Sequence, residues 1–459
     1  MIDISVKNGK LYDALLTLTK VTLDIVSRRI NNELVFSAEN IWEKQSADTY
    51  IKRQTQKTLW GIVLHKASDE IKATKECINL FSVLESDKTI SPQLNTLVGT
   101  CMGSHRIEAH NIASWPVYEF LTDQGIAQFN VSTFNSIYTK LESALYADEI
   151  EYENLTPLCG FSAEDPIISL DENISIVKLS EKEIIEILRL GINIGTSLGI
   201  TDFVHGIHQY ALKTTFRLKK IIGDREPDSN EFENNDYIKG TNEIAIVDAL
   251  RIYKEGKLYP ISTIRRSNNI FSIGTSFSFE NPVKHFMNKK YKLTKDEAVE
   301  FQSFWNTQKE TQLPEKNFLS VGIRRFSQSN ERNNIEDRII DLMIAAESIF
   351  LSSGGSFQGE LKYRLSHRAS MFIENDVEKQ RYVFDFMQKA YDVRSSIVHG
   401  STPKLPKKID GSEYTLEEFC GDIEKYLRIS IKKTMSQMVK AQDKINIIDW
   451  KSVIFPETN

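Results

Sequence analysis

Between residues 337 and 350, apolar side chains recur at steps of three and four positions. An α-helix turns once in about 3.6 residues, so this spacing places them on one face of a helix. Residues 361–372 and 384–391 carry similar stripes. The pattern predicts helices that pack with their apolar faces inward. The stripes consist of Ile339, Leu342, Met343, Ala346, Ile349 and Phe350, then Leu361, Leu365, Ala369 and Phe372, then Phe384, Met387 and Tyr391.

A further helix is predicted to begin near Thr415. The run Thr415-Leu416-Glu417-Glu418 has the form of a capping box, in which threonine and a glutamate three residues later satisfy free backbone N–H groups. An amphipathic pattern follows to about Ala441. Four helices are enough for a bundle core. We therefore expect a C-terminal helical bundle at residues 291–459.

The upstream sequence predicts an α-rich N-terminal region at 1–150 and a mixed region with antiparallel strands at 151–290, which would sense a signal or recognise a substrate. The expected fold class is α+β, predominantly α. An acidic loop at 223–236 is expected to be exposed. Helices are expected at 11–26, 50–84 and 133–145, and after Ser180 as a cap with Glu183. Strands are expected at 174–177, 216–218, 244–253 and 258–264, with a hairpin turn at Glu255-Gly256-Lys257.

Composition limits the class of protein. A formal net charge of −6 over 459 residues argues against a protein that coats nucleic acid without selectivity. The fractions of hydrophobic residues (41%) and charged residues (26%) are typical of a folded globular chain. No run of about eighteen apolar residues occurs, and the first residues lack the apolar core of a signal peptide. We expect a cytoplasmic protein that does not bind a membrane.

The sequence offers no clear metal or cofactor site. The cysteines are scattered, which favours reduced, buried thiols over disulfides or zinc. The pairs His105 with His110 and His205 with His208 lack neighbouring cysteines and a zinc-like spacing, so packing or surface roles are favoured. No Gly-x4-Gly-Lys-Ser/Thr loop is present. The cysteines are Cys77, Cys101, Cys159 and Cys420.

Arg394 and His399 are the residues most suited to chemistry on RNA. Transesterification of a phosphodiester needs a group that moves a proton to or from a ribose oxygen, and imidazole titrates in the useful range. A guanidinium can stabilise the charge on the phosphate in the transition state. The two residues stand five positions apart near the expected end of a helix, which Gly400 is suited to terminate.

The spacing alone has two interpretations. Five residues turn an ideal helix by roughly 140° and advance it about 7.5 Å, so the side chains share a stripe only if the last turn loosens. A structural arginine and a helix-end histidine are the more common case for such a spacing. If the pair is catalytic, one arginine and one histidine are few groups for a nuclease. A composite site of two chains across a twofold axis would supply more.

The surrounding sequence resembles the HEPN superfamily, and more narrowly its Apea-like domains, over residues 317–438. The resemblance rests on the helix 337–350, on the run Gly-Glu-Leu-Lys-Tyr-Arg-Leu-Ser-His-Arg-Ala at 359–369, and on Tyr-Asp-Val-Arg-Ser-Ser-Ile-Val-His-Gly at 391–400. Arg394 and His399 match the family's Arg-x4-6-His pair. The position after the arginine is often Asn, Asp or His in this family, and Ser395 occupies it here. That departure puts any auxiliary role of this position in doubt.

The resemblance implies a metal-independent endoribonuclease. His399 would act as general base or acid, and Arg394 would hold the scissile phosphate. Products would carry a 2′,3′-cyclic phosphate or a 3′-phosphate, together with a 5′-hydroxyl. With the composite site argued above, we expect a homodimer. The resemblance further points to a role in prokaryotic antiviral defence, where cleavage of RNA, transfer RNA among the candidates, halts infection. A phage-derived or cellular trigger would release the activity.

Other residues are candidates for supporting roles. Glu347 lies within the apolar helix, where it would orient Arg394 or Arg364, or else lie at the edge of the stripe in water. Tyr391 leads toward Arg394 on the same predicted helix. Arg364 and Arg368 could contact RNA phosphates, although helical arginines more often form solvated ion pairs. Lys404 and Lys407, on the loop after His399, could guide RNA or only aid solubility.

The rival hypothesis is a catalytically inactive HEPN bundle that serves as a dimerisation or regulatory module. In that case Arg394 and His399 would hold the helix end together. An RNA-binding adaptor without cleavage is disfavoured by the acidic balance and by the lack of a recognisable aromatic platform for bases.

Overall fold

The structure is a computed structural model that describes residues 6–33, 35–94, 97–100, 103–192, 194–195, 203–223, 241–267, 276–277, 290–311, 317–352, 360–408, 411–440 and 448–454. The chain is α+β and mostly helical, with antiparallel sheets in its first half and a helical C-terminal region, as the sequence predicts. It divides into two compact units. Unit 1 comprises residues 1–157, 171–241 and 261–280, and unit 2 comprises 158–170, 242–260 and 281–459.

Helices of unit 1 enclose two apolar clusters, one around Leu15 and Leu80 and the other around Trp60 and Phe120. Leu11, Leu15 and Leu18 of the first helix pack with Leu80, Leu84 and Tyr138. The buried carboxylate of Glu142 accepts hydrogen bonds from the backbone N–H groups of Lys7 and Asn8, near the first turn of that helix. The helices are α1 (Gly9–Glu33), α2 (Trp60–Lys66), α3 (Ser68–Lys72), α4 (Lys75–Ser86), α5 (Ala109–Gln124) and α6 (Val131–Tyr146), with the 3-10 turn η1 (Ser91–Gln93).

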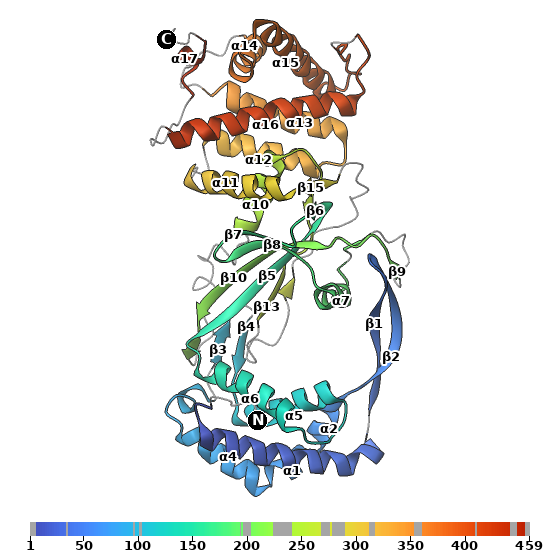
Figure 1. The fold of residues 1–459 in the computed structure, drawn as a ribbon, viewed down its shortest axis with the longest axis vertical. Coiled ribbons are helices and arrows are strands. Elements are labelled where there is room, and N and C mark those ends of the chain that lie inside the picture. Colours follow the sequence, from blue (N-terminus) through green and yellow to red (C-terminus); the bar gives the residue numbers. More distant parts are fainter. Residues whose placement is uncertain are drawn as a thin grey trace. The chain divides into compact units, whose positions relative to one another are not determined.

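A two-stranded ribbon interrupts this helical region, so the prediction of helix at 50–84 was wrong in its first part. Strands β1 (Phe36–Ser46) and β2 (Thr49–Thr58) pair antiparallel. Most of their residues are polar, and Glu39 pairs with Lys57 and Glu43 with Arg53 across the strands. Such a ribbon lacks the alternating apolar pattern that signals a half-buried strand. It is drawn as a long blue hairpin in Figure 1.

The main sheet of unit 1 is antiparallel. Strand β10 (Tyr210–Lys219) pairs with β5 (Glu149–Cys159) on one side and with β8 (Ile174–Lys178) on the other. The strand expectations at 174–177 and 216–218 are confirmed, and Ser180 with Glu183 forms the expected capping box of α7 (Glu181–Arg189). The remaining strands are β3 (Leu97–Thr100), β4 (Gly103–Arg106), β9 (Phe203–Val204), β11 (Ile221–Gly223), β13 (Ile264–Ser267) and β14 (Ser276–Phe277).

Unit 2 contains the helical bundle together with segments from the middle of the chain. The predicted domain boundaries near 150 and 290 therefore differ from the observed division, because 158–170 and 242–260 pack with the bundle. The predicted acidic loop at 224–236 lies outside the described residues. The middle segments carry β6 (Phe161–Ala163), most of β7 (Ile167–Asp171), α10 (Thr241–Tyr253) and β12 (Tyr259–Pro260). Strand β15 (Tyr291–Leu293) runs parallel to β6.

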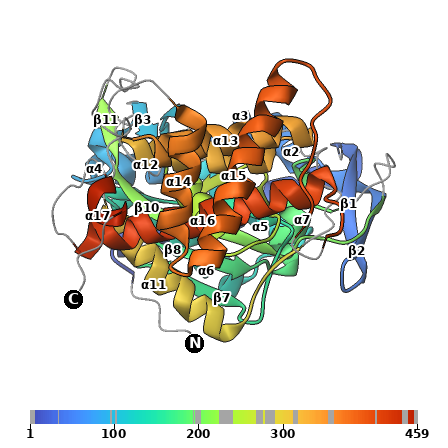
Figure 2. The same cartoon turned by 90° about the horizontal axis from the view of Figure 1, so that it is seen from above.

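The bundle helices bury most of the apolar stripes predicted from the sequence, but Leu361, expected to face the core, is exposed at the first position of α14 (Leu361–Ile373). Leu342, Ile349, Leu365 and Phe372 are buried in one core with Met387. Thr415 and Glu418 form the expected capping box. Figure 2 shows α14 and α15 of this bundle next to each other. The helices are α11 (Lys295–Thr311), α12 (Phe318–Glu331), α13 (Ile335–Phe350), α14 (Leu361–Ile373), α15 (Val377–Val398), α16 (Leu416–Lys440) and α17 (Trp450–Ile454).

Helix α10 corrects the expectation of a strand at 244–253. Ile246, Val247 and Leu250 are fully or almost fully buried, at the spacing of a helical face. The region is rich in Ile and Val, and this β-propensity suggested a strand, but packing against the bundle overrides it. The expected hairpin turn at Gly256 instead connects α10 to β12.

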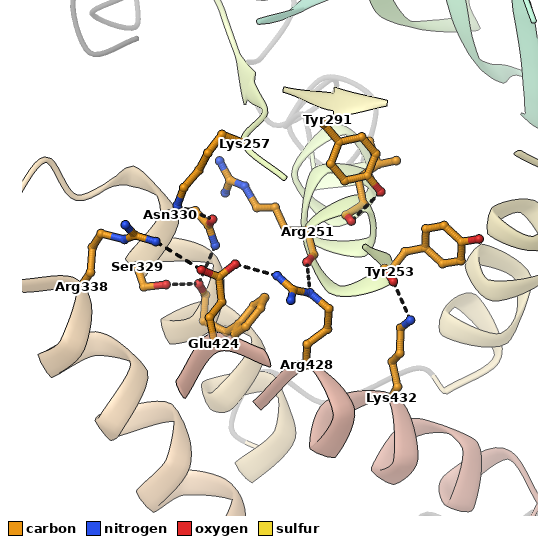
Figure 3. Close-up of polar contacts among 12 residues, drawn as sticks. Arg251, Tyr253, Lys257, Tyr291, Ser329, Asn330, Arg338, Glu424, Arg428 and Lys432 are labelled. Atoms are coloured by element: carbon orange, nitrogen blue, oxygen red, sulfur yellow. Dashed lines mark hydrogen bonds and ion pairs between the residues drawn. The ribbon is translucent and has the colours of Figure 1, made fainter. Parts of the chain in front are cut away.

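Buried polar groups attach α10 to the bundle (Figure 3). The carboxylate of Glu424 accepts hydrogen bonds from Arg338 at 3.2 Å and from Arg428 at 2.6 Å. Arg428 Nε also donates to the carbonyl oxygen of Arg251, and Lys432 Nζ donates to that of Tyr253. Cations at the C-terminal carbonyls of a helix are favourable both as hydrogen-bond donors and against the helix dipole. Two side chains of α16 thus cap α10.

Candidate active site

Helix α15 places Arg394 and His399 at its C-terminal end. Asp376 caps the other end, where its side chain accepts a hydrogen bond from the N–H of Lys379. Buried residues along one face, including Ala390 and Val393, fix the rotation of the helix against the core. That rotation leaves Arg394 half-buried and His399 exposed.

The end of α15 is a Schellman motif, as Gly400 predicted. Gly400 has a φ of 68°, in the left-handed region, and its N–H donates to the carbonyl of Ile397. The N–H of Ser401 donates to the carbonyl of Ser396 at 2.8 Å. These two bonds satisfy carbonyls that the helix leaves free. They fix the backbone of His399 as the C-cap residue directly after α15, and its side chain is exposed.

Among the residues that the structure describes, the guanidinium of Arg394 has no hydrogen-bond or ion-pair partner. Its Nε is buried and has no hydrogen-bond partner, and within the described part of the chain Arg394 forms no ion pair. A buried donor without an acceptor costs free energy, in the range of about 1–3 kcal/mol. His399 likewise has no side-chain hydrogen bond among the described residues. Within the described ranges neither side chain makes a hydrogen bond or ion pair, and Arg394 could bind an anion at this helix end.

The residues predicted to support the site make few contacts with Arg394 or His399. Glu347 is half-buried on α13, but among the described residues it pairs with neither Arg394 nor Arg364. Tyr391 is half-buried against the bundle core. The backbone carbonyl of Ser395 accepts a hydrogen bond from the N–H of His399. This bond does not involve the Ser395 side chain.

Arg368 has a structural position. Its guanidinium donates to the carbonyl of Phe350 at 2.9 Å and lies 4.8 Å from the ring centre of Trp450. Burial, together with the neighbouring charge of Arg364, lowers the pKa of Arg368. These contacts favour packing over RNA contact at Arg368, whereas Arg364 is half-buried one turn away.

The loop after His399 exposes both predicted lysines. Lys404 is exposed, and Lys407 is exposed beside a backbone bridge to Glu413. The adjacent Lys408 pairs with Glu418 at 2.7 Å. The first two ammonium groups are therefore open to an anionic partner.

Sequence reasoning missed two features near the site. Lys362 of α14 bonds both carboxylate oxygens of Asp392, at 2.7 and 2.8 Å, and so ties α14 to the last turns of α15. The ring of Tyr363, half exposed, lies parallel to His367 and edge-on to Phe384. The four-residue spacing of Tyr363 and His367 was visible in the sequence, but the contribution of Phe384 depends on how the helices pack.

The described residues contain no group of three or more His, Cys, Asp or Glu side chains that could hold a metal ion. Within the same ranges no helix is long and apolar enough to cross a membrane. Of the cysteines within the described ranges, Cys77, Cys159 and Cys420 are buried and form no disulfide bond.

Comparisons with models of protein families, with curated proteins and with solved structures found no match.

Proposed function

We propose that this protein is a metal-independent endoribonuclease of the HEPN type that acts in prokaryotic antiviral defence. The observation that carries the proposal is the half-buried, unpaired guanidinium of Arg394 at the end of α15, followed by the exposed His399. An unpaired cation inside a helical bundle is costly unless it serves an anionic ligand. The scissile phosphate of RNA is such a ligand.

In the proposed reaction, His399 removes the proton from the ribose 2′-hydroxyl or returns a proton to the leaving 5′-oxygen. Arg394 donates hydrogen bonds to the non-bridging oxygens as charge accumulates on them. The 2′-oxygen attacks the phosphorus and the bond to the 5′-oxygen breaks. The products are a 2′,3′-cyclic phosphate, which can hydrolyse to a 3′-phosphate, and a 5′-hydroxyl.

The proposal includes a homodimer, because a second copy would double the few reactive groups of one chain. Unit 1 would respond to a phage-derived or cellular trigger, or recognise the RNA. Lys404 and Lys407, exposed on the loop that follows His399, would attract the phosphate backbone.

The test is cleavage of a mixed pool of transfer and messenger RNA by the parent and by Arg394→Ala and His399→Ala variants. Matched controls are Arg381→Ala, an arginine on α15 whose partner is the exposed Glu378, and His110→Ala, whose partner is Glu108 in unit 1. The proposal expects cleavage by the parent and both controls and none by the site variants. Equal cleavage by all five proteins would contradict it.

The alternative is an inactive dimerisation or regulatory module in which Arg394 and His399 stabilise the helix end. No cleavage by the parent, even with extract from infected cells as a source of trigger, would favour this alternative. Among the described residues the Arg394 side chain makes no hydrogen bond or ion pair, and this weighs against the alternative.

A further inference from the structure

Helix α14 is basic. Its sequence from Leu361 to Ile373 contains Lys362, Arg364 and Arg368 and no aspartate or glutamate. Asp392 of α15 bonds the ammonium group of Lys362 through both carboxylate oxygens and offsets one of these charges. The helix together with this partner keeps a net positive charge, which attracts an anionic chain such as RNA.

Two of these cations lie one turn apart. Burial, together with the charge of Arg364, lowers the pKa of Arg368. Arg368 donates to the backbone carbonyl of Phe350 and lies over the Trp450 ring, and neither of these groups carries a charge. Like charges at this spacing destabilise a helix, and an anion nearby would relieve the repulsion.

An aromatic pair lies on the adjoining stripe of α14. Tyr363 is 50% exposed, and its ring lies parallel to that of His367, at an interplanar angle of 7° with centroids 5.8 Å apart. The ring of Phe384 on α15 meets that of Tyr363 at 75° and a centroid distance of 5.6 Å. Tyr363 and His367 each precede one of the two arginines, so the aromatic stripe runs beside the cationic one. Proteins stack unpaired bases on aromatic rings that lie beside cations.

Phe384 relates this pair of rings to the candidate active site. Helices α14 and α15 lie side by side (Figure 2). Phe384 precedes Arg394 by ten positions on α15, so their Cα atoms are about 15 Å apart along the helix axis and about 80° apart around it. The two residues therefore lie on neighbouring sides of one helix. An extended RNA strand whose phosphate binds Arg394 can reach Tyr363 with a base a few nucleotides away.

We propose that Tyr363 stacks on an unpaired base of the RNA substrate, which is therefore single-stranded or looped at this point. The inference rests on the proposed function, which supplies RNA as the ligand. His367 lies against one face of the Tyr363 ring, and the base takes the other face and continues the stack. Bases inside a duplex are already stacked and paired with one another, so they offer no face to Tyr363.

The test measures the affinity of the full chain for a fluorescent RNA without internal pairing, alone and annealed to its complement. His399→Ala serves as the background for every variant, so that the RNA stays intact. Tyr363→Ala and Tyr363→Leu should each weaken binding of the single strand by about tenfold, the loss expected when one base loses an aromatic stacking partner. Binding of the duplex should not change.

Two further variants separate stacking from general effects of substitution. Tyr363→Trp should bind the single strand as tightly as the background, because an indole keeps the aromatic face. Tyr118→Ala is the matched control, since Tyr118 is 39% exposed on a helix of unit 1, and it should leave the affinity unchanged. If Tyr363→Ala lowers the melting temperature, Tyr363→Leu still tests the stack, because leucine keeps apolar bulk but no ring.

The inference would be overturned if the background did not bind the single strand, or if Tyr363→Ala and Tyr363→Leu bound it with unchanged affinity. An equal loss of affinity for the duplex would also overturn it. So would a loss that accompanies a change from dimer to monomer in size-exclusion chromatography, because Tyr363 would then contact a second copy of the chain.

Cleavage by the parent judges the proposed function separately. If the parent cleaves RNA and the Tyr363 variants bind it as the background does, only the base-stacking site is contradicted. If the chain binds RNA through Tyr363 and the parent does not cleave it, only the nuclease is contradicted.

Discussion

The Nε atom of Arg428 donates a hydrogen bond of 3.0 Å to the carbonyl oxygen of Arg251, although 177 positions separate the two residues. The same guanidinium bonds the buried carboxylate of Glu424. One arginine of α16 thus caps α10 and neutralises an interior charge (Figure 3). This contact explains why a helix from the middle of the chain belongs to the bundle.

Arg428→Met should therefore destabilise unit 2 strongly. The substitution leaves Glu424 with Arg338 as its remaining cation among the described residues and frees the Arg251 carbonyl. We expect a loss of about 3 kcal/mol in the free energy of unfolding, measured by urea denaturation. Arg381→Met, which breaks an exposed ion pair on α15, should have little effect. Equal effects of the two substitutions would contradict the role of Arg428.

Asp248 should make stability depend on pH. Burial raises the pKa of its carboxyl to about 6, in spite of the hydrogen bond from Ser327, which lowers it. Because folding raises this pKa from 3.8, the stability that the group contributes is fully present below 3.8 and is lost as the pH rises through about 6. Asp248→Asn, which stays neutral, should match the parent near pH 4 and exceed its stability by about 2 kcal/mol at pH 8.

Urea denaturation of both proteins between pH 4 and pH 8 provides the measurement. Asp385→Asn is the control, because Asp385 is exposed on α15. If the stability difference between Asp248→Asn and the parent were largest at acidic pH, the predicted pH dependence would be contradicted.

Gly400→Ala tests the helix end that holds His399. The left-handed φ of 68° is costly for alanine, at about 1 kcal/mol, while the added Cβ meets no atom within 4 Å. Gly411→Ala is a matched control with φ of 82° and similar open space. The two variants should lose similar stability, measured by thermal denaturation. If RNA is cleaved at this site, Gly400→Ala should also slow cleavage and Gly411→Ala should not. Equal slowing by the two variants would contradict a specific role of this helix end in the reaction.

Arg394→Ala should leave stability unchanged or increased. The substitution removes a buried Nε that has no acceptor, so the folded state loses an unpaired donor. The inactive-module alternative expects a lower melting temperature instead, since it gives Arg394 a structural contact. Thermal denaturation of the variant beside the parent distinguishes the two, and a fall of several degrees would favour the alternative.

Local patterns predicted the bundle well, because its helices carry strong apolar periodicity and explicit caps. Ile349 and Leu365 are buried as expected, and Thr415 and Gly400 begin and end helices as expected. The sequence could not assign α10, since β-branched residues mimic a strand when the bundle that buries them is distant in sequence. The polar ribbon β1–β2 also gave no apolar signal.

The sequence predicted which residues make up the candidate site, but it did not predict which side chains contact one another there. The sequence identified Arg394 and His399, and no local rule could tell that Glu347 would stay apart from Arg394. Likewise, the packing of Arg368 on Trp450 joins residues far apart along the chain. Such contacts depend on helix packing rather than on spacing.

The most direct test of the proposed function is the chemistry of RNA ends produced in the presence of a metal chelator. Purified parent protein and the His399→Ala variant would be incubated with RNA, and the termini of the fragments determined. The proposal predicts 5′-hydroxyl ends with 2′,3′-cyclic phosphates or 3′-phosphates for the parent alone. A requirement for Mg²⁺, 5′-phosphate ends, or equal cleavage by His399→Ala would contradict it.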